Sequence, residues 1–364
     1  MTSAELSPEI VVVGAGIAGA SLAVRLGEAG RRVVLIEGED RPGYHTTGRS
    51  AAFWHETLGG PAIIPLTQAS EGELRDGGFL AARPALEIAQ DADREAMASF
   101  VAANQALGVR VELLDRAGLL DHIPGLREGW SAGALETECA DIDVAALHQH
   151  YLSRARGAGV ELWTRARLAS ARREGGVWQL GLEDGRSLAC RVLANAAGAW
   201  ADPVAQIAGA RPLGIQPKRR TIAVLRVNPP PPRALPLVMD SGGGFYFRPD
   251  GDRLWLSPHD ETDSEPCDAA PEELDVAIAI DRFEKVVDWR IERVEARWAG
   301  LRSFAPDRVM VIGWDAGVEG LFWCAGQGGF GIQTAPAASR MATQLLLGEA
   351  IDWIDPAPYD PARF

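Results

Sequence analysis

Three glycines near the start of the chain, Gly14, Gly16 and Gly19, have the spacing of a loop that can hold phosphates. They follow an apolar run typical of a buried parallel strand and precede a helix expected over 20–29. Such glycines permit a tight turn and a close approach of the backbone to a pyrophosphate, which the helix N-terminus then faces. Glu37 ends the next apolar run, where its carboxylate can bind a ribose diol. Strand, helix, strand and acid in this order predict a dinucleotide site, with a coincidental turn as the alternative, and Glu37 disfavours NADP.

Length and composition set the broad class. The chain has 364 residues, more than one hydrophobic core usually holds, which predicts two joined domains. Its 47% hydrophobic and 24% charged residues are typical of a globular protein, and a net charge of −14 argues against nucleic acids and anionic membranes as partners. No apolar stretch is long enough to span a bilayer, and the first strand begins too close to Met1 for a signal peptide. We expect a cytoplasmic protein.

The four cysteines, Cys139, Cys190, Cys267 and Cys324, are scattered and form no C-x-x-C pair. This pattern predicts reduced thiols and neither a disulfide framework nor a metal site.

Hydrophobic periodicity predicts helices and strands at both ends of the chain, with antiparallel strands between them. Helices are expected over 87–107, 143–156, 274–289 and 335–347, the second capped by Asp143 and the last ended by Gly348. Strands are expected over 33–36, 160–163, 177–182, 187–193, 221–227, 244–247, 253–256 and 321–324. One domain is therefore expected to interrupt the other.

Four segments carry a family resemblance: the N-terminal glycine unit, residues 43–52, residues 195–200 and the glycine loop 326–333. Together they resemble FAD-dependent oxidoreductases of the D-amino acid oxidase family, and residues 141–149, 216–220 and 298–304 are most similar to its bacterial D-arginine dehydrogenases. The resemblance covers nearly the whole chain. It implies an α/β fold with some α+β elements, in which a Rossmann-like FAD-binding domain (1–84, 143–213 and 303–364) is interrupted by a mixed-sheet substrate-binding domain (85–142 and 214–302).

The cofactor implied by the resemblance is FAD, bound non-covalently because no cysteine or histidine stands where a flavin linkage would form. The loop before the helix expected at Ala335 can also stabilise a negatively charged reduced flavin through its amides and the helix dipole. The implied contacts are Gly14, Gly16, Ile17, Ala18, Gly19, Glu37, Gly38, Thr46, Thr47, Gly48, Arg49, Ser50, Ala51, Ala52, Phe53, Leu168, Ala197, Gly198, Gly300, Gly328, Gly329, Phe330, Gly331, Ile332 and Gln333.

The same resemblance places Arg220 and Arg302 at a substrate carboxylate, with Tyr246 nearby. A guanidinium suits this role because its planar fork takes both oxygens and stays charged when dry. Taken alone, Arg220 lies in a Lys-Arg-Arg run that is more often a solvated face, and Arg302 could equally form a structural salt bridge. Tyr246 stands between two phenylalanines, which fits a pocket wall, with packing as the alternative.

The chain departs from the D-arginine dehydrogenase pattern around the substrate side chain. Phe53, Leu58 and Ala85 stand where that enzyme has a histidine, a tyrosine and the glutamate that holds the guanidinium. An apolar pocket is therefore expected, because an unpaired buried guanidinium costs several kcal/mol. Its remaining walls would come from Leu237, Met239, Gly329, Phe330 and Ile332. His45, His55 and His259 are possible acid/base groups, with His55 the strongest candidate, although a lone histidine is more often structural.

The leading functional expectation is oxidation of a neutral, apolar D-amino acid by hydride transfer to flavin N5, giving a 2-oxo acid and ammonia. The alternatives are oxidation of glycine, an N-methyl or cyclic secondary amino acid or a 2-hydroxy acid, and a non-catalytic flavoprotein, which the retained arginines disfavour. The only lysines, Lys218 and Lys285, lie outside the flavin segments, which favours a dehydrogenase over an oxidase. The electron acceptor stays open.

Overall fold

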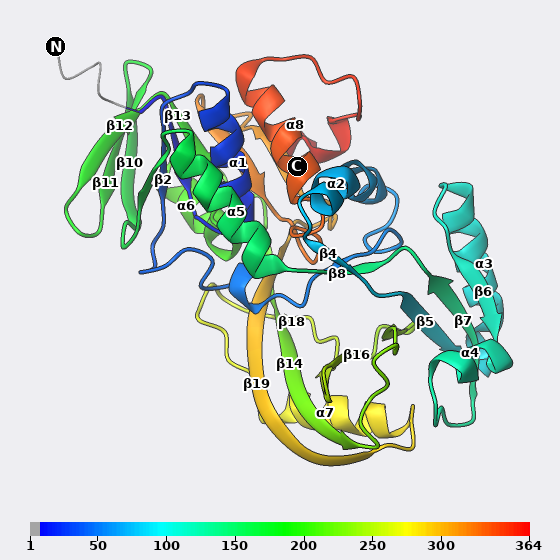
Figure 1. Cartoon of the computed structure of the whole chain (residues 1–364). Helices are drawn as coiled ribbons and strands as arrows, with labels where there is room; N and C mark the ends of the chain where they lie inside the picture. Colours follow the sequence, from blue (N-terminus) through cyan, green and yellow to red (C-terminus); the bar gives the residue numbers. More distant parts are fainter. Residues whose placement is uncertain (1–7) are drawn as a thin grey trace.

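Residues 8–364 are described by a computed structural model, in which two main sheets carry the fold (Figure 1). The first sheet has six strands in the order β20-β21-β13-β1-β2-β9, all parallel to their neighbours except β20. Its strands are short, and apart from the more exposed edge strand β9 they are apolar, as expected for strands buried on both faces. They are β1 (Ile10–Val13), β2 (Val33–Ile36), β9 (Glu161–Trp163), β13 (Val192–Asn195), β20 (Val311–Trp314) and β21 (Leu321–Ala325).

Both faces of this sheet are covered. Val12 and its same-face neighbours pack under the helices α1 (Ile17–Glu28), α5 (Val144–Gly157) and α8 (Ala335–Leu347). Val11 and Val13 point the other way, toward α6 (Ala201–Ile207) and a three-stranded sheet. That small sheet consists of β10 (Leu168–Glu174), β11 (Val177–Leu182) and β12 (Ser187–Cys190), and α2 (Ile64–Asp76) packs on α8.

The second sheet has nine strands in the order β18-β14-β17-β16-β15-β5-β7-β6, with β19 paired to β14. The long β14 and β19 run side by side through most of the lower half in Figure 1. The strands are β5 (Ala85–Gln90), β6 (Glu112–Asp115), β7 (Trp130–Glu136), β14 (Gln216–Asn228), β15 (Leu237–Asp240), β16 (Tyr246–Asp250), β17 (Arg253–Ser257), β18 (Thr262–Asp263) and β19 (Arg290–Phe304).

The two faces of the nine-stranded sheet have different roles. Alternate residues such as Leu225 and Phe247 pack against α7 (Glu273–Glu284) and α4 (Arg116–His122), and α3 (Arg94–Ala106) packs beside β7. On the opposite face Ile222, Leu237 and Tyr246 form a smaller apolar cluster with Phe53 from the N-terminal part of the chain. A short sheet of β3 (Phe53–Trp54), β8 (Ala140–Ile142) and β4 (Leu80–Ala82) links the two halves.

The expected fold class is confirmed, and all six strands of the first sheet fall inside the three ranges expected for FAD binding. The exact domain boundaries stay a prediction. Two helix predictions are wrong at their edges. Residues 87–90 belong to β5, because this segment pairs with β15 on one side and β7 on the other. The helix expected to extend to Trp289 ends at Glu284, because Val286 and Val287 enter the core under the sheet.

Several elements were not anticipated, among them α2, α4, α6, β7, β20 and the full length of β19. Within residues 8–364, no helix combines the length and the apolar character needed to cross a membrane.

Candidate active site

The glycine turn after β1 is built as tightly as the spacing predicts. Gly14 has φ +98°, and a Cβ there would lie 2.6 Å from the carbonyl oxygen of Ala196. A Cβ on Gly19 would lie 1.8 Å from the Gly14 carbonyl oxygen. Neither contact is sterically allowed, so glycine is required where the strand turns into α1. The N-terminus of α1 is thereby held at the carboxyl edge of the sheet.

Two side chains hold this turn from outside. Glu37 follows β2 and accepts the backbone N–H groups of Ala15 (2.9 Å) and Glu39 (3.0 Å). The His148 Nε2 donates to the carbonyl oxygen of Ala15 at 2.8 Å. Burial lowers the pKa of His148, so the ring stays neutral with its proton on Nε2.

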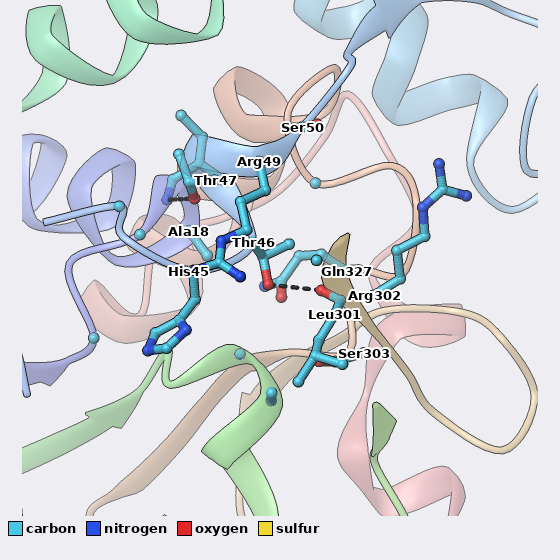
Figure 2. A pocket seen from close by; sticks show the side chains of 18 of the residues that line it. Ala18, His45, Thr46, Thr47, Arg49, Ser50, Leu301, Arg302, Ser303 and Gln327 are labelled. Atoms are coloured by element: carbon cyan, nitrogen blue, oxygen red, sulfur yellow. Dashed lines mark hydrogen bonds between the residues drawn. The ribbon is translucent and has the colours of Figure 1, made fainter. Parts of the chain in front are cut away.

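The loop after β2 contacts both the glycine turn and the nine-stranded sheet. Thr47 Oγ1 accepts the N–H of Ile17 at 3.0 Å, and Thr46 Oγ1 donates to the carbonyl oxygen of Leu301 at 2.6 Å (Figure 2). Arg49 donates through Nη1 to the carbonyl oxygens of Ala299 (3.0 Å) and Ala269 (2.7 Å). Residues 46–49 therefore contact both the start of α1 and the end of β19.

The C-terminal glycine loop closes the site from the third side. Gly328 has φ +55°, and a Cβ on Gly329 would lie 2.9 Å from Arg302 Nη1. The amide of Gln333 bonds the backbone N–H and the carbonyl oxygen of His55, each at 3.3 Å. The loop thus packs closely against both β19 and the 55–58 turn, directly before α8.

A single cavity runs past all of these segments. The glycine turn and Glu37 lie along it, and so do Arg220, Tyr246 and Arg302 from the nine-stranded sheet. The glycine turn, which has no room for a Cβ, fits the pyrophosphate of a dinucleotide. The carboxylate after the second strand fits its ribose. Of the expected cofactor contacts, Gly19, Gly48 and Phe330 do not line the cavity. Gly19 and Gly48 pack against the backbone of their own turns, and Phe330 packs into the core under the helices.

Arg220 is only 5% exposed, and two of its guanidinium nitrogens have protein partners. Nε donates to the carbonyl oxygen of Asp260 at 2.8 Å, and Nη2 lies 3.2 Å from the Glu261 carboxylate. Nη1 is buried and has no partner within residues 8–364. Burial and the positive charge of Arg302 lower the pKa of Arg220 to about 10, which still leaves it charged at neutral pH. An oriented cation with a free N–H group borders the cavity.

Arg302 lies on β19, in a row of residues paired with β14, and its side chain extends into the cavity away from Thr46 (Figure 2). It forms no hydrogen bond or ion pair with any side chain between residues 8 and 364. Salt bridges therefore do not account for Arg302. The two arginines together can hold a carboxylate by a charge-assisted, forked contact.

Tyr246 and His259 flank these arginines. The Tyr246 ring lines the cavity while Phe245 and Phe247 face the core, as the alternation predicted. The His259 ring packs edge-on against Tyr246, with centroids 5.6 Å apart. Burial and the adjacent guanidinium groups of Arg220 and Arg302 lower the pKa of His259 to about 3. The sequence offered His259 only as one of three possible acid/base histidines, because nothing local distinguishes it from the others.

The remaining wall is mostly apolar, as expected. Phe53, Leu58, Leu237 and Met239 line the cavity, together with Ile222, which sequence reasoning missed. Gly329 and Ile332 also line it, whereas Ala85 is buried beside Leu237 and does not. His55 is the polar exception in this wall.

The fold and the cavity are those of a flavin-dependent oxidoreductase: a Rossmann-like dinucleotide unit whose site opens onto two arginines of a second sheet. The chain belongs to the FAD dependent oxidoreductase (DAO) family, whose sequence profile matches residues 9–345.

Three relatives show how far this similarity reaches. The hydrogen cyanide synthase subunit HcnC of Pseudomonas aeruginosa is 25% identical over 408 residues, covering 98% of this chain and 96% of HcnC. The structure of glycine oxidase from Geobacillus kaustophilus superposes with a TM-score of 0.86 at 21% identity and covers 98% of this chain and 99% of that one. L-proline dehydrogenase from P. horikoshii superposes with a TM-score of 0.85 at 20% identity and 98% coverage of both chains.

FAD is therefore the cofactor, and we expect it to be bound without a covalent link. The buried Cys324 is the cysteine closest in sequence to the glycine loop, and it does not line the cavity. Acid precipitation should leave a colourless pellet and a yellow supernatant. A yellow pellet after washing would contradict this prediction.

Proposed function

We propose that the protein oxidises the bond between the α-carbon and the nitrogen of a small amino acid: glycine, an N-methyl glycine or a cyclic secondary amino acid. The observation that supports this most directly is the pair Arg220 and Arg302, which border one cavity with guanidinium N–H groups that have no acceptor within residues 8–364. A protein that kept FAD only for structure has no need of such a clamp.

The protein's own residues would act mainly by positioning. Arg302 and Arg220 hold the carboxylate, and the Tyr246 ring beside Arg220 limits how the bound molecule can rotate. Phe53, Leu237 and Met239 exclude water from the reacting carbon. FAD supplies the two-electron acceptor when bound. Holding the substrate in one orientation can account for a large part of the rate acceleration. The imine that forms would hydrolyse in water to a 2-oxo acid and ammonia or an amine.

The choice of a small or secondary amine rests on the relatives' printed names, glycine oxidase and proline dehydrogenase, and on the apolar wall of the cavity. The same apolar wall favours a second candidate, a neutral D-amino acid such as D-leucine. The resemblance to D-arginine dehydrogenases would then concern the clamp and not the side-chain pocket, because Phe53 and Leu58 line the cavity in place of polar groups.

Anaerobic bleaching of the flavin separates these candidates. The panel is glycine, N-methylglycine, L-proline, D-leucine and glycolate, each mixed with the purified protein while the flavin absorbance is followed. Fast bleaching by the first three supports the proposal, and bleaching by D-leucine alone supports the second candidate. Bleaching by glycolate alone indicates a 2-hydroxy acid, and no bleaching by any compound would sink both candidates.

A further inference from the structure

His55 is a buried polar group in the apolar wall of the cavity. It follows β3, its side chain lines the cavity, and it is only 3% exposed. Its Nδ1 is buried and has no hydrogen-bond partner within residues 8–364. A buried imidazole nitrogen without a partner is costly unless a ligand completes its hydrogen bond.

The opposite ring nitrogen is firmly anchored. Nε2 lies 3.2 Å from Glu136 Oε2 and 2.8 Å from Thr57 Oγ1. Glu136 is itself 1% exposed and accepts the backbone N–H groups of Glu56 (2.7 Å) and Thr57 (3.3 Å). A carboxylate held in this way keeps its charge, and because it faces Nε2 it favours the tautomer whose proton is on Nε2. In this tautomer the lone pair of neutral His55 is on Nδ1, as in histidines oriented by a carboxylate for proton transfer.

The charged groups around His55 come from three elements: Glu136 from β7, Glu87 from β5 and Glu56 from the same turn as His55. The C-terminal loop contributes the uncharged Gln333. Burial alone would lower the pKa of His55, but these carboxylates outweigh it and the pKa is raised above the usual value. Glu136 has the largest effect, and its own pKa is lowered by His55 and by the two backbone donors despite its burial.

The other histidine at this end of the cavity has the opposite surroundings. His259 lies beside Arg220 and Arg302, and it bonds the Gly243 carbonyl oxygen through Nδ1 at 3.1 Å. With a pKa near 3 it stays neutral and too weakly basic to hold a substrate proton. Because their surroundings shift the two pKa values in opposite directions, His55 is the stronger base of the two.

We propose that His55 accepts a proton from the ammonium group of the bound amino acid, with Glu136 as the residue that positions it. The inference rests on the proposed amine oxidation. In the step, one N–H bond of the substrate ammonium breaks and an N–H bond forms at Nδ1, leaving a neutral amine and an imidazolium whose Nε2–H still faces Glu136. No electrons are transferred, and the proton leaves to solvent after the product departs.

The test is the pH dependence of anaerobic flavin reduction by the best amine of the panel at saturating concentration. The wild-type rate should fall on the acid side of the raised His55 pKa, because protonated His55 cannot accept a proton. His55→Gln should lose this limb and, near neutral pH, reduce the flavin about 100-fold more slowly. Its rate should recover toward wild type in alkaline solution, where the amine is already deprotonated.

Glu136→Gln is the sharper variant. If Glu136 had only a structural role, its replacement would leave the acid limb of the rate profile at the same pH. Removing the carboxylate that raises the His55 pKa should shift the limb toward acid by about one pH unit or more. Glu138→Gln is the matched control: Glu138 is two residues away, partly exposed and paired with Arg110 at 3.4 Å, and it does not line the cavity. That variant should keep the wild-type profile. FAD content of each variant is measured first to confirm folding.

Two outcomes would overturn the inference while leaving the proposed function intact: a wild-type limb that persists in His55→Gln, or one that stays in place in Glu136→Gln. If His55→Gln does not fold, the Glu136→Gln profile decides alone. A wild-type flavin that no amine reduces would overturn the proposed function, and this inference with it.

Discussion

Replacing Arg302 with alanine should raise the dissociation constant of the substrate by two orders of magnitude or more. The guanidinium has no acceptor among the described residues, so the substrate carboxylate would be its partner. Leaving a charge unpaired in such a site costs roughly 3–5 kcal/mol. The measurement is the substrate concentration needed for half-maximal flavin reduction under anaerobic conditions.

The control variant lies on the same strand. Arg297 is paired with Glu273 at 3.4 Å on the exposed part of β19, and Arg297→Ala should bind substrate normally. Arg302→Lys should also bind poorly, because an ammonium cannot reproduce the two-pronged contact. If the flavin of Arg302→Ala were bleached at the substrate concentrations that bleach the wild type, Arg302 would not be the residue that anchors the substrate carboxylate.

D-arginine should be turned over at least about a hundredfold less efficiently than D-leucine or a better neutral substrate, because nothing in the apolar wall replaces the hydration of its guanidinium. The carboxylates nearest to this wall, Glu56, Glu87 and Glu136, do not line the cavity. Glu136 and Glu87 act on His55 instead. The measurement is kcat/KM with an artificial electron acceptor.

D-citrulline, which is similar in size to D-arginine but uncharged, separates length from charge. If the two are equally poor, the pocket excludes length. If D-citrulline is accepted and D-arginine rejected, charge decides. Efficient turnover of D-arginine would mean that one of the three glutamates rotates into the cavity.

Local patterns predicted those parts of the fold that local physics decides. The turn at Gly14, the cap at Asp143, where the side chain accepts the Ala146 N–H at 2.9 Å, and the stop at Gly348 each depend on a few neighbouring residues. The helix expected from Glu87 failed for the opposite reason. Residues 87–90 form a strand only because β15 and β7, distant in sequence, lie on either side.

The site followed the same division. Strand alternation placed Tyr246 on the cavity wall, and family resemblance placed Arg220 and Arg302 there. No sequence pattern could show that Glu136 would meet His55, because the contact joins residues 81 positions apart through two different sheets. His259 was one of three possible acid/base histidines, and no sequence pattern could show that it would pack against Tyr246 beside Arg220.

The strand order of the six-stranded sheet also governs when the protein can become functional in a cell. The β1 strand lies between β2 and β13, which is made about 180 residues later, and β13 waits in turn for β21 at residues 321–325. Ribosomes add about 5–20 residues per second, so the first strands stay unpaired on one side for on the order of ten seconds or more. The glycine loop at 328–333 emerges later still. The nascent chain therefore exposes an apolar strand edge until β13 and β21 have been made, and the complete FAD site cannot form before the glycine loop has emerged.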